Sequence, residues 1–322
     1  MASDYDFDYE TKVPCFDLTE CFEEGSQGWK KLCQQVRQAS EEYGCFQVLY
    51  TNSVPLEQHE DMFMKMKELF DVPLELKRKN KNPKPYDGYI GRTPKNPYIE
   101  SMGIEHAEKS DQVRDFTNLM WPAGGNPSFC ESLDSMTKKM IELEHICLKM
   151  VFDSYGLEKY YESLVEKDNT INVVHLVKYD SLATDEPAIG ATAHTDKGII
   201  TVLNSNIQGL EILSKKNKWI LVEPRKETFT IFIGDSLKVW SNGRVHLARH
   251  RVMLKEKNER YSYVAFVIPK DDGVVEVAKE FIDEDGLHRY RPYKFNDFLR
   301  FYYADVYQDD ALQSFAGVVD NA

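Results

Sequence analysis

The triplet His194-Thr195-Asp196 combines two residue types that bind metal ions. In an extended backbone alternate side chains share a face, so His194 and Asp196 point one way and Thr195 points the other. A third nitrogen donor from elsewhere in the chain would complete a site of two histidines and one carboxylate. Such a site suits non-haem Fe(II) and leaves coordination positions open for substrates. Taken alone the triplet is weak evidence, because surface polar clusters produce it often.

Two histidines compete for the third position. The stretch GRVHLARHRVML, residues 243–254, contains His246 and His250 just before a run that is typical of a β-strand. Positions 246, 248 and 250 would share one face of any strand, so spacing alone leaves both candidates open.

A second chemical pattern lies in the segment RYSYVAF. Arg260 and Ser262 are two residues apart, and Val264 and Phe266 continue the same face, while Tyr261, Tyr263 and Ala265 form the other. An inward-facing guanidinium beside a hydroxyl is a good receptor for a carboxylate, which it binds through charge-assisted hydrogen bonds. The alternative is that Arg260 is neutralised by an acidic neighbour, and for an isolated Arg-x-Ser we would favour it.

The elements that must position these residues divide the chain into a helical and a β-rich part. Helical spacing predicts helices at 26–43, with Ser26 as N-cap, at 55–73 and at 127–156, and the polar segment 77–126 is expected to be a loop with lid or substrate-wall duty. From residue 171 onward short β-type runs follow one another without intervening helices, which indicates a sandwich or barrel. A final helix is expected at about 292–315. We therefore predict one domain at 1–322, mainly β with surrounding helices: a mostly helical part (1–160), a β core (161–292) and a C-terminal helix (293–322).

Composition narrows the class of protein. Hydrophobic residues make up 42% and charged residues 29% of the 322 residues, as in soluble globular proteins, and the net charge of −13 disfavours nucleic acid and anionic membranes as partners. The basic run at 77–85 is expected to be a solvated loop. The first residues are acidic and lack a signal or transit pattern, so a cytosolic location is the expectation. Six scattered cysteines indicate free thiols rather than disulfides.

In combination, these motifs resemble the plant iron(II)- and 2-oxoglutarate-dependent dioxygenases. The resemblance rests on HTD at 194–196, HRV beginning at His250 and RYS ten residues beyond that histidine, and it extends to VPCFDL, GCFQVL, NGRVHLARHRV and AFVIP. IESMGI (99–104) and FTNLMWP (116–122) are similar to segments of the AOP-type branch, whose members modify glucosinolate side chains.

The resemblance implies a double-stranded β-helix (jelly-roll) core and a role for several residues. His194, Asp196 and His250 would hold Fe(II), which makes His246 a bystander, and Arg260, Ser262 and Tyr179 would hold the distal carboxylate of 2-oxoglutarate. Tyr179 departs from the commoner proline-containing pattern. Further aromatic residues are candidates for the substrate pocket, with core packing as the alternative: Phe116, Trp121 and Phe266. The remaining histidines are expected to be structural: His59, His106, His145, His175 and His288. His175 lies on the same face of its predicted strand as Tyr179, so it could also face the interior of the β core.

The expected reaction is the oxidation of a small molecule coupled to decarboxylation of 2-oxoglutarate to succinate. Fe(II) is the implied cofactor, 2-oxoglutarate and O2 are the cosubstrates, and ascorbate is a supporting reductant. Hydroxylation of a plant specialised metabolite, such as an alkaloid, a steroid-like or a glucosinolate-type compound, is the first choice. Demethylation, desaturation or ring formation by the same oxidant stay open, as do a 2-oxoglutarate-independent iron oxidase and a non-catalytic binding protein on the same scaffold. A monomer is expected.

Overall fold

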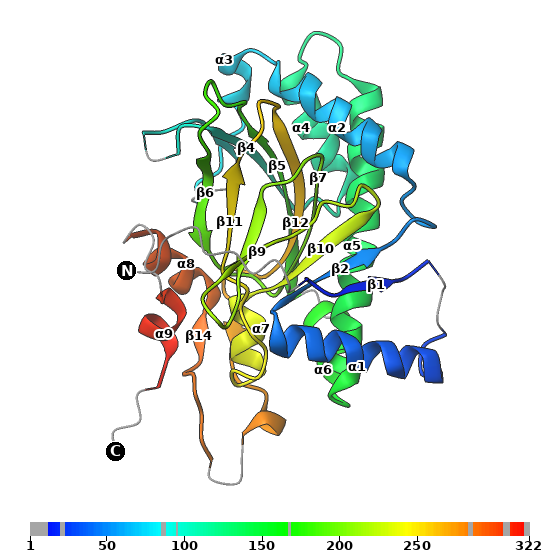
Figure 1. Ribbon diagram of the computed structural model, residues 1–322, viewed down its shortest axis with the longest axis vertical. Helices are drawn as coiled ribbons and strands as arrows, with labels where there is room; N and C mark the ends of the chain where they lie inside the picture. The colour runs from blue at the N-terminus through cyan, green and yellow to red at the C-terminus, as the bar shows by residue number, and fades with distance from the viewer. Residues whose placement is uncertain are drawn as a thin grey trace.

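Two facing β-sheets form the centre of the protein, and helices cover the outer face of the larger sheet (Figure 1). The computed structural model describes residues 12–19, 23–84, 88–94, 96–166, 169–282, 286–304 and 310–318. Its α-helices are α1 (Gln27–Glu42), α2 (Leu56–Phe70), α3 (Leu74–Lys77), α4 (Ser110–Met120), α5 (Pro127–Ser154), α6 (Glu158–Tyr161), α7 (Asp235–Trp240), α8 (Phe295–Ala304) and α9 (Ala311–Ala316). A π-helical turn (Glu162–Glu166) follows α6, and a 3-10 turn (Lys279–Phe281) precedes the C-terminal region.

The larger sheet has eight strands and the smaller one has four. The larger has the order β1 (Cys15–Asp17), β2 (Cys45–Leu49), β10 (Thr228–Ile233), β7 (Ile200–Ser205), β12 (Arg260–Pro269), β5 (Thr170–Tyr179), β4 (Ile99–Glu105) and β3 (Tyr89–Ile90). The smaller has the order β6 (Ala188–His194), β11 (His250–Leu254), β8 (Leu210–Leu213) and β9 (Trp219–Leu221). A short pair, β13 (Val274–Val275) and β14 (Tyr293–Lys294), leads to the C-terminal helices. The two facing sheets form the sandwich that the strand spacing predicted and the jelly-roll core that the family resemblance implied.

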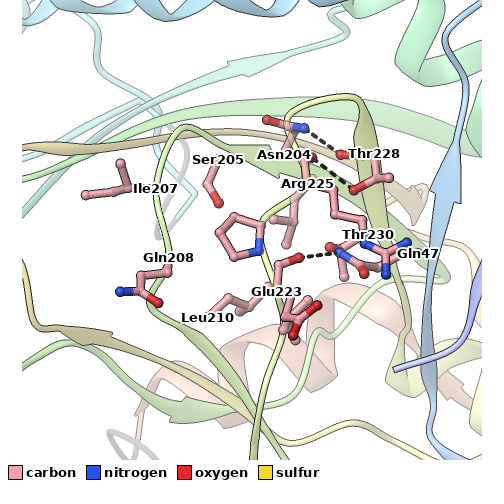
Figure 2. A pocket seen from close by; sticks show the side chains of 13 residues that line it. Gln47, Asn204, Ser205, Ile207, Gln208, Leu210, Glu223, Arg225, Thr228 and Thr230 are labelled. Carbon is pink, nitrogen blue, oxygen red and sulfur yellow. Dashed lines mark hydrogen bonds between the residues drawn. The ribbon is translucent and has the colours of Figure 1, made fainter. Parts of the chain in front are cut away.

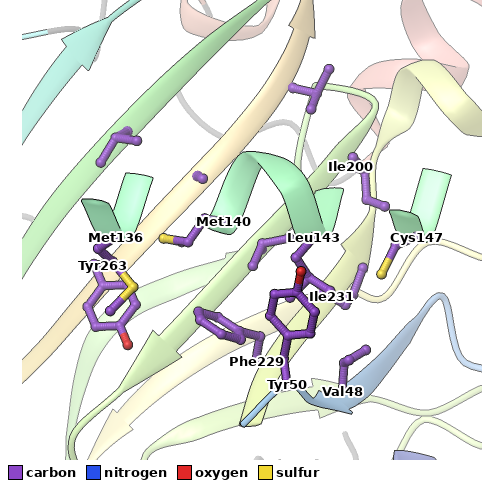
Figure 3. Close-up of a cluster of buried hydrophobic side chains, with 14 of the residues drawn as sticks. Val48, Tyr50, Met136, Met140, Leu143, Cys147, Ile200, Phe229, Ile231 and Tyr263 are labelled. Carbon is purple, nitrogen blue, oxygen red and sulfur yellow. The ribbon is translucent and has the colours of Figure 1, made fainter. Parts of the chain in front are cut away.

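The outer face of the larger sheet is buried by the long helix α5. Its apolar residues lie over side chains of β2, β7, β10 and β12, as Figure 3 shows for Met140 and Leu143 above Phe229 and Ile231. Tyr261, Tyr263 and Ala265 of β12 belong to this outer core, which confirms the predicted division of that strand into two faces.

The inner faces of the two sheets enclose a second apolar cluster. The larger sheet contributes Val177, Tyr179, Leu203, Phe232 and the partly buried Val264, and the smaller sheet contributes Leu210, Ile212, Val252 and Leu254. Arg260 and Ser262 share the face of Val264 along β12, so the alternation of the strand turns both toward this interior. The interior between the sheets is therefore apolar with a few polar groups, which is the usual make-up of a small-molecule site.

Several sequence predictions are confirmed in detail. Helix α1 begins after Ser26, whose hydroxyl accepts a hydrogen bond from the Trp29 backbone N–H at 3.1 Å. The predicted helices at 55–73 and 127–156 correspond to α2 and α5. Five of the six cysteines lie in the described ranges and are free thiols, and Cys21 lies outside them. Within those same ranges, no helix has the length and apolar character needed to cross a membrane.

Other predictions were wrong. The segment 77–126 is not one loop, because it contains β3, β4 and α4; β4 is buried on both faces and so lacks the alternation that signals a strand. The basic run is not wholly solvated, since Lys77 is buried in an ion pair with Glu100. The single C-terminal helix is replaced by α8 and α9, with 305–309 outside the described residues.

Candidate active site

Two strands of the smaller sheet bring the predicted metal ligands together. Strand β6 ends at His194 and β11 begins at His250, and these residues are direct cross-strand partners. Asp196 follows two residues after His194, and its Oδ1 lies 3.9 Å from His194 Nε2 and 3.8 Å from His250 Nε2. One ligand atom from each residue fits within 4.8 Å of the others. This arrangement can hold one metal ion through two nitrogens and one carboxylate oxygen.

Both imidazoles are oriented by backbone carbonyls. Nδ1 of His194 lies 2.8 Å from the Thr192 carbonyl oxygen, and Nδ1 of His250 lies 3.0 Å from the Ala248 carbonyl oxygen. A carbonyl only accepts, so each Nδ1 carries the proton and each Nε2 keeps its lone pair. The Nε2 atoms are the ones that face Asp196, so both rings are prepared to bind a metal.

The electrostatics of the site favour a neutral imidazole at His194. Burial, followed by the neighbouring His250, lowers the pKa of His194 below its ordinary value, so the ring is unprotonated at neutral pH. The side chain of His194 is 33% exposed, whereas Asp196 and His250 are 8% and 7% exposed. The site therefore opens to solvent beside His194.

Phe232 of β10 is a site residue that the sequence analysis missed. Its ring stacks on His250 with centroids 4.2 Å apart and 26° between the planes. The signal was the alternation along TFTIFI, which places Phe232 on the inner face with Thr228 and Thr230. This aromatic ring fixes the His250 imidazole from the larger sheet.

His246 lies away from the metal ligands. The strand starts only at His250, so the parity argument that grouped 246 with 250 did not apply. The His246 backbone N–H donates to the Ser40 carbonyl, and burial together with Lys238 and Lys215 lowers the pKa of its ring to about 4. Of the two histidines, the structure brings His250, and not His246, together with His194 and Asp196.

Arg260, Ser262 and Tyr179 meet at one end of the interior. Arg260 is 1% exposed, its Nη1 donates to the Ser262 hydroxyl, and its guanidinium lies 5.2 Å from the centroid of the Tyr179 ring. Arg260 and Tyr179 are cross-strand partners on β12 and β5. The structure therefore brings all three predicted residues together.

The buried guanidinium has no carboxylate partner among the residues that the structure describes. Arg260 Nε makes no hydrogen bond there, and the tyrosine ring and the serine hydroxyl leave the positive charge uncompensated. A buried arginine of this kind is costly unless an anion pairs with it. The residues thus fit a bound carboxylate, and the acidic-neighbour alternative is wrong for the described part of the chain.

A strand connects this cationic group to the metal ligands. A Cβ added to Gly190 of β6 would lie 2.9 Å from Tyr179 Cδ1, so glycine is needed for the close approach. His194 is four residues further along the same strand, about 13 Å at the usual rise of a strand.

The three candidate pocket aromatics lie in different places. Phe116 and Trp121 pack against Phe129 in the outer core, with ring centroids 6.3 and 4.7 Å from it. Phe266 is half-buried on the inner face of β12 and contacts the His175 ring edge-on at 5.3 Å. Of the three, only Phe266 lies on the inner face of the larger sheet, where its ring contacts His175.

A small polar cavity lies beside the Arg260–Ser262 end of the interior (Figure 2). Gln47, Ser205, Leu210, Arg225 and Thr230 are among its lining residues, and Ser205 is the strand partner of Ser262. Its free volume is about 10 Å³, enough for at most a single water molecule. This cavity is too small to be a substrate site.

Comparison with known proteins agrees with this geometry. A profile of the 2OG-Fe(II) oxygenase superfamily matches residues 168–269, and one for the N-terminal region of non-haem dioxygenases in morphine synthesis matches 13–124. The fold and the site thus define a 2-oxoglutarate- and Fe(II)-dependent oxygenase.

Similar sequences and structures show to which branch of this family the chain belongs. It is 33% identical to the probable 2-oxoglutarate-dependent dioxygenase AOP1.2 of Arabidopsis thaliana, over 95% of this chain and 96% of the relative. Two solved structures are similar: the 2-oxoglutarate complex of the Arabidopsis dioxygenase for auxin oxidation 1 (28% identity, TM-score 0.75, 85% of this chain and 99% of that one) and the rice dioxygenase for auxin oxidation (27%, 0.79, 95% and 100%). The chain belongs to the 2-oxoglutarate-dependent dioxygenases of the AOP type, and it is an enzyme that uses Fe(II) and 2-oxoglutarate.

Proposed function

We propose that His194 Nε2, the Asp196 carboxylate and His250 Nε2 hold Fe(II), and that Arg260 and Ser262 bind the distal carboxylate of 2-oxoglutarate beside Tyr179. When bound, the iron and 2-oxoglutarate use O2 to oxidise a C–H bond, with succinate and CO2 as coproducts. The observation that carries this proposal is the buried guanidinium of Arg260, which lacks an acidic partner in the described residues and shares an interior with the three ligands.

The part played by the protein is placement and exclusion of water. The Thr192 and Ala248 carbonyls hold the two imidazoles in the metal-binding tautomer, and Phe232 blocks movement of the His250 ring. Apolar side chains on the inner sheet faces limit water around the reacting atoms. A substrate held beside the solvent-exposed side of His194 would present one C–H bond to the iron. The shape of the substrate site would therefore decide which bond is oxidised.

The substrate that we propose is a small plant metabolite, hydroxylated by this enzyme. The two solved structures compared above are described as dioxygenases for auxin oxidation, which supports a small organic substrate. Phe266 and His175 line the proposed pocket with one apolar and one polar ring. Alkaloid, steroid-like and glucosinolate-type compounds are the classes to screen first, with demethylation, desaturation and ring formation as other products to look for. A cytosolic location, a monomeric state and the lack of nucleic-acid binding stay predictions.

An anaerobic titration tests the proposal. Fe(II)-loaded protein is titrated with 2-oxoglutarate while the visible metal-to-ligand charge-transfer band is followed. Wild type and the matched control His246→Ala should develop the band, and His250→Ala should not. Absence of the band in wild-type protein that has bound iron would refute the assignment of Arg260 and Ser262. Aerobic succinate formation with candidate substrates then separates a 2-oxoglutarate-dependent enzyme from an independent iron oxidase.

A further inference from the structure

The loop that follows the metal ligands is attached to the start of helix α7. The Asp235 backbone N–H donates to the Asp196 carbonyl at 2.8 Å, and the Ser236 N–H donates to the Gly198 carbonyl at 3.0 Å. The Ser236 hydroxyl donates to the Lys197 carbonyl at 2.9 Å. The backbone of Asp196 is thus fixed by a helix that itself contributes no metal ligand.

A buried ion pair reinforces this attachment. Lys197 Nζ lies 2.8 Å from Asp235 Oδ2 and 2.8 Å from the Thr195 hydroxyl oxygen, and the side chains of Lys197 and Asp235 are 9% and 1% exposed. The ring of Tyr302 in the C-terminal helix α8 covers the ammonium, with its centroid 4.4 Å from Nζ. The contacts of Lys197 are therefore shielded from solvent, and charge-assisted hydrogen bonds are stronger in such an environment than in water.

The position of this pair relative to the ligands gives it a role. Residues 195 and 197 flank Asp196 in the sequence, and the Lys197 ammonium ties the Thr195 hydroxyl to Asp235. The side chains of Thr195 and Lys197 contact each other and Asp235, whereas the Asp196 side chain faces the two histidines. Holding 195 and 197 together limits rotation of the backbone between them, and this rotation sets the direction of the Asp196 carboxylate. Groups that orient a metal ligand in this way typically change metal affinity 10- to 100-fold.

We propose that Lys197 is a positioning residue for the metal site: with Thr195 and Asp235 it aims the Asp196 carboxylate, and Tyr302 seals the pair. This inference rests on the proposed function, because it assumes that Asp196 binds the metal. It assigns to the C-terminal helix a part in metal binding although α8 lies outside the ligand cluster.

The test compares two neutralised ion pairs. Lys197→Met/Asp235→Asn removes both charges together, so neither is left buried without a partner. The matched control is Lys77→Met/Glu100→Gln, since Lys77 and Glu100 form a similarly buried pair (8% and 2% exposed) that includes no neighbour of the metal ligands. Each protein is titrated with Co(II) alone and followed by the visible absorption of the bound ion, and its urea unfolding is measured in parallel without metal.

We expect Co(II) affinity to fall 10- to 100-fold in Lys197→Met/Asp235→Asn, with an altered Co(II) spectrum, and to stay within about twofold of wild type in the control. Affinity within twofold of wild type in both variants, or an equal loss in both, would overturn the inference. Thr195→Val, which removes only the hydroxyl, should lose affinity several-fold and serves if the double variant does not fold. If wild-type protein binds no Co(II), the proposed metal site itself is wrong, and the inference falls with it.

Discussion

Replacing Arg260 with methionine should stabilise the free enzyme while it abolishes binding of 2-oxoglutarate. The guanidinium is 1% exposed and has no carboxylate partner among the described residues. Exchanging buried ionic groups for apolar side chains of similar volume stabilises proteins by about 1–4 kcal/mol. Loss of one partner from a buried charge pair costs a ligand about 2–5 kcal/mol, which weakens binding roughly 30- to several thousand-fold. The two effects have opposite signs, and this makes the prediction specific.

Thermal unfolding of the Mn(II)-loaded protein, with and without 2-oxoglutarate, measures both effects. At 2-oxoglutarate concentrations of about 100 times Kd, wild type should gain roughly 2.7 kcal/mol, and Arg260→Met should gain almost nothing. Without 2-oxoglutarate, Arg260→Met should unfold at the higher temperature. A lower unfolding temperature of the free variant would mean that the arginine is already neutralised. An undiminished gain from 2-oxoglutarate would place the cosubstrate elsewhere.

Three further predictions follow from buried groups. Glu144 is fully buried without a hydrogen-bond partner among the described residues, and burial raises its pKa. The stability of Glu144→Gln relative to wild type should therefore increase as pH rises above the ordinary carboxyl pKa, by up to about 1.4 kcal/mol per pH unit. Urea unfolding at pH 5 and 7.5 tests this, and a pH-independent difference would refute it. Phe116→Ala should cost about 3–5 kcal/mol as a core truncation, whereas Phe266→Ala should cost less and uncouple succinate formation from substrate oxidation; equal unfolding midpoints would contradict this. Glu211 is buried between Arg251 and Lys255, so Glu211→Ala should lower the unfolding free energy by about 3–5 kcal/mol. A loss below about 1 kcal/mol would argue against an energetic role for these two ion pairs.

The local pattern of the sequence was sufficient to predict the faces of individual strands. The period of two along β12 correctly separated Arg260 and Ser262 from Tyr261 and Tyr263, because one face packs on helices and the other on the interior. The same kind of local signal identified α1 and its cap.

What the local pattern could not supply was contact between distant segments. His194 and His250 are neighbours only because β6 and β11 pair, and spacing within 243–254 could not show where β11 begins. The stacking of Phe232 on His250 and the ion pair of Lys197 with Asp235 also join segments about 20 to 40 residues apart. Such contacts depend on the topology of the sheets, and periodicity carries no information about them.

The pairing of His194 with His250 also bears on how the protein withstands loss of its metal. Strand β6 is the outermost strand of the smaller sheet as described, so only β11 holds it on one side. A metal bound by both histidines would fasten this edge strand to its neighbour, adding a cross-link where the backbone ladder is weakest. Chelation should then loosen β6 first, raising hydrogen exchange and proteolysis there while the strands under α5 stay protected. Metal content would thus govern not only turnover but also the lifetime of the folded enzyme.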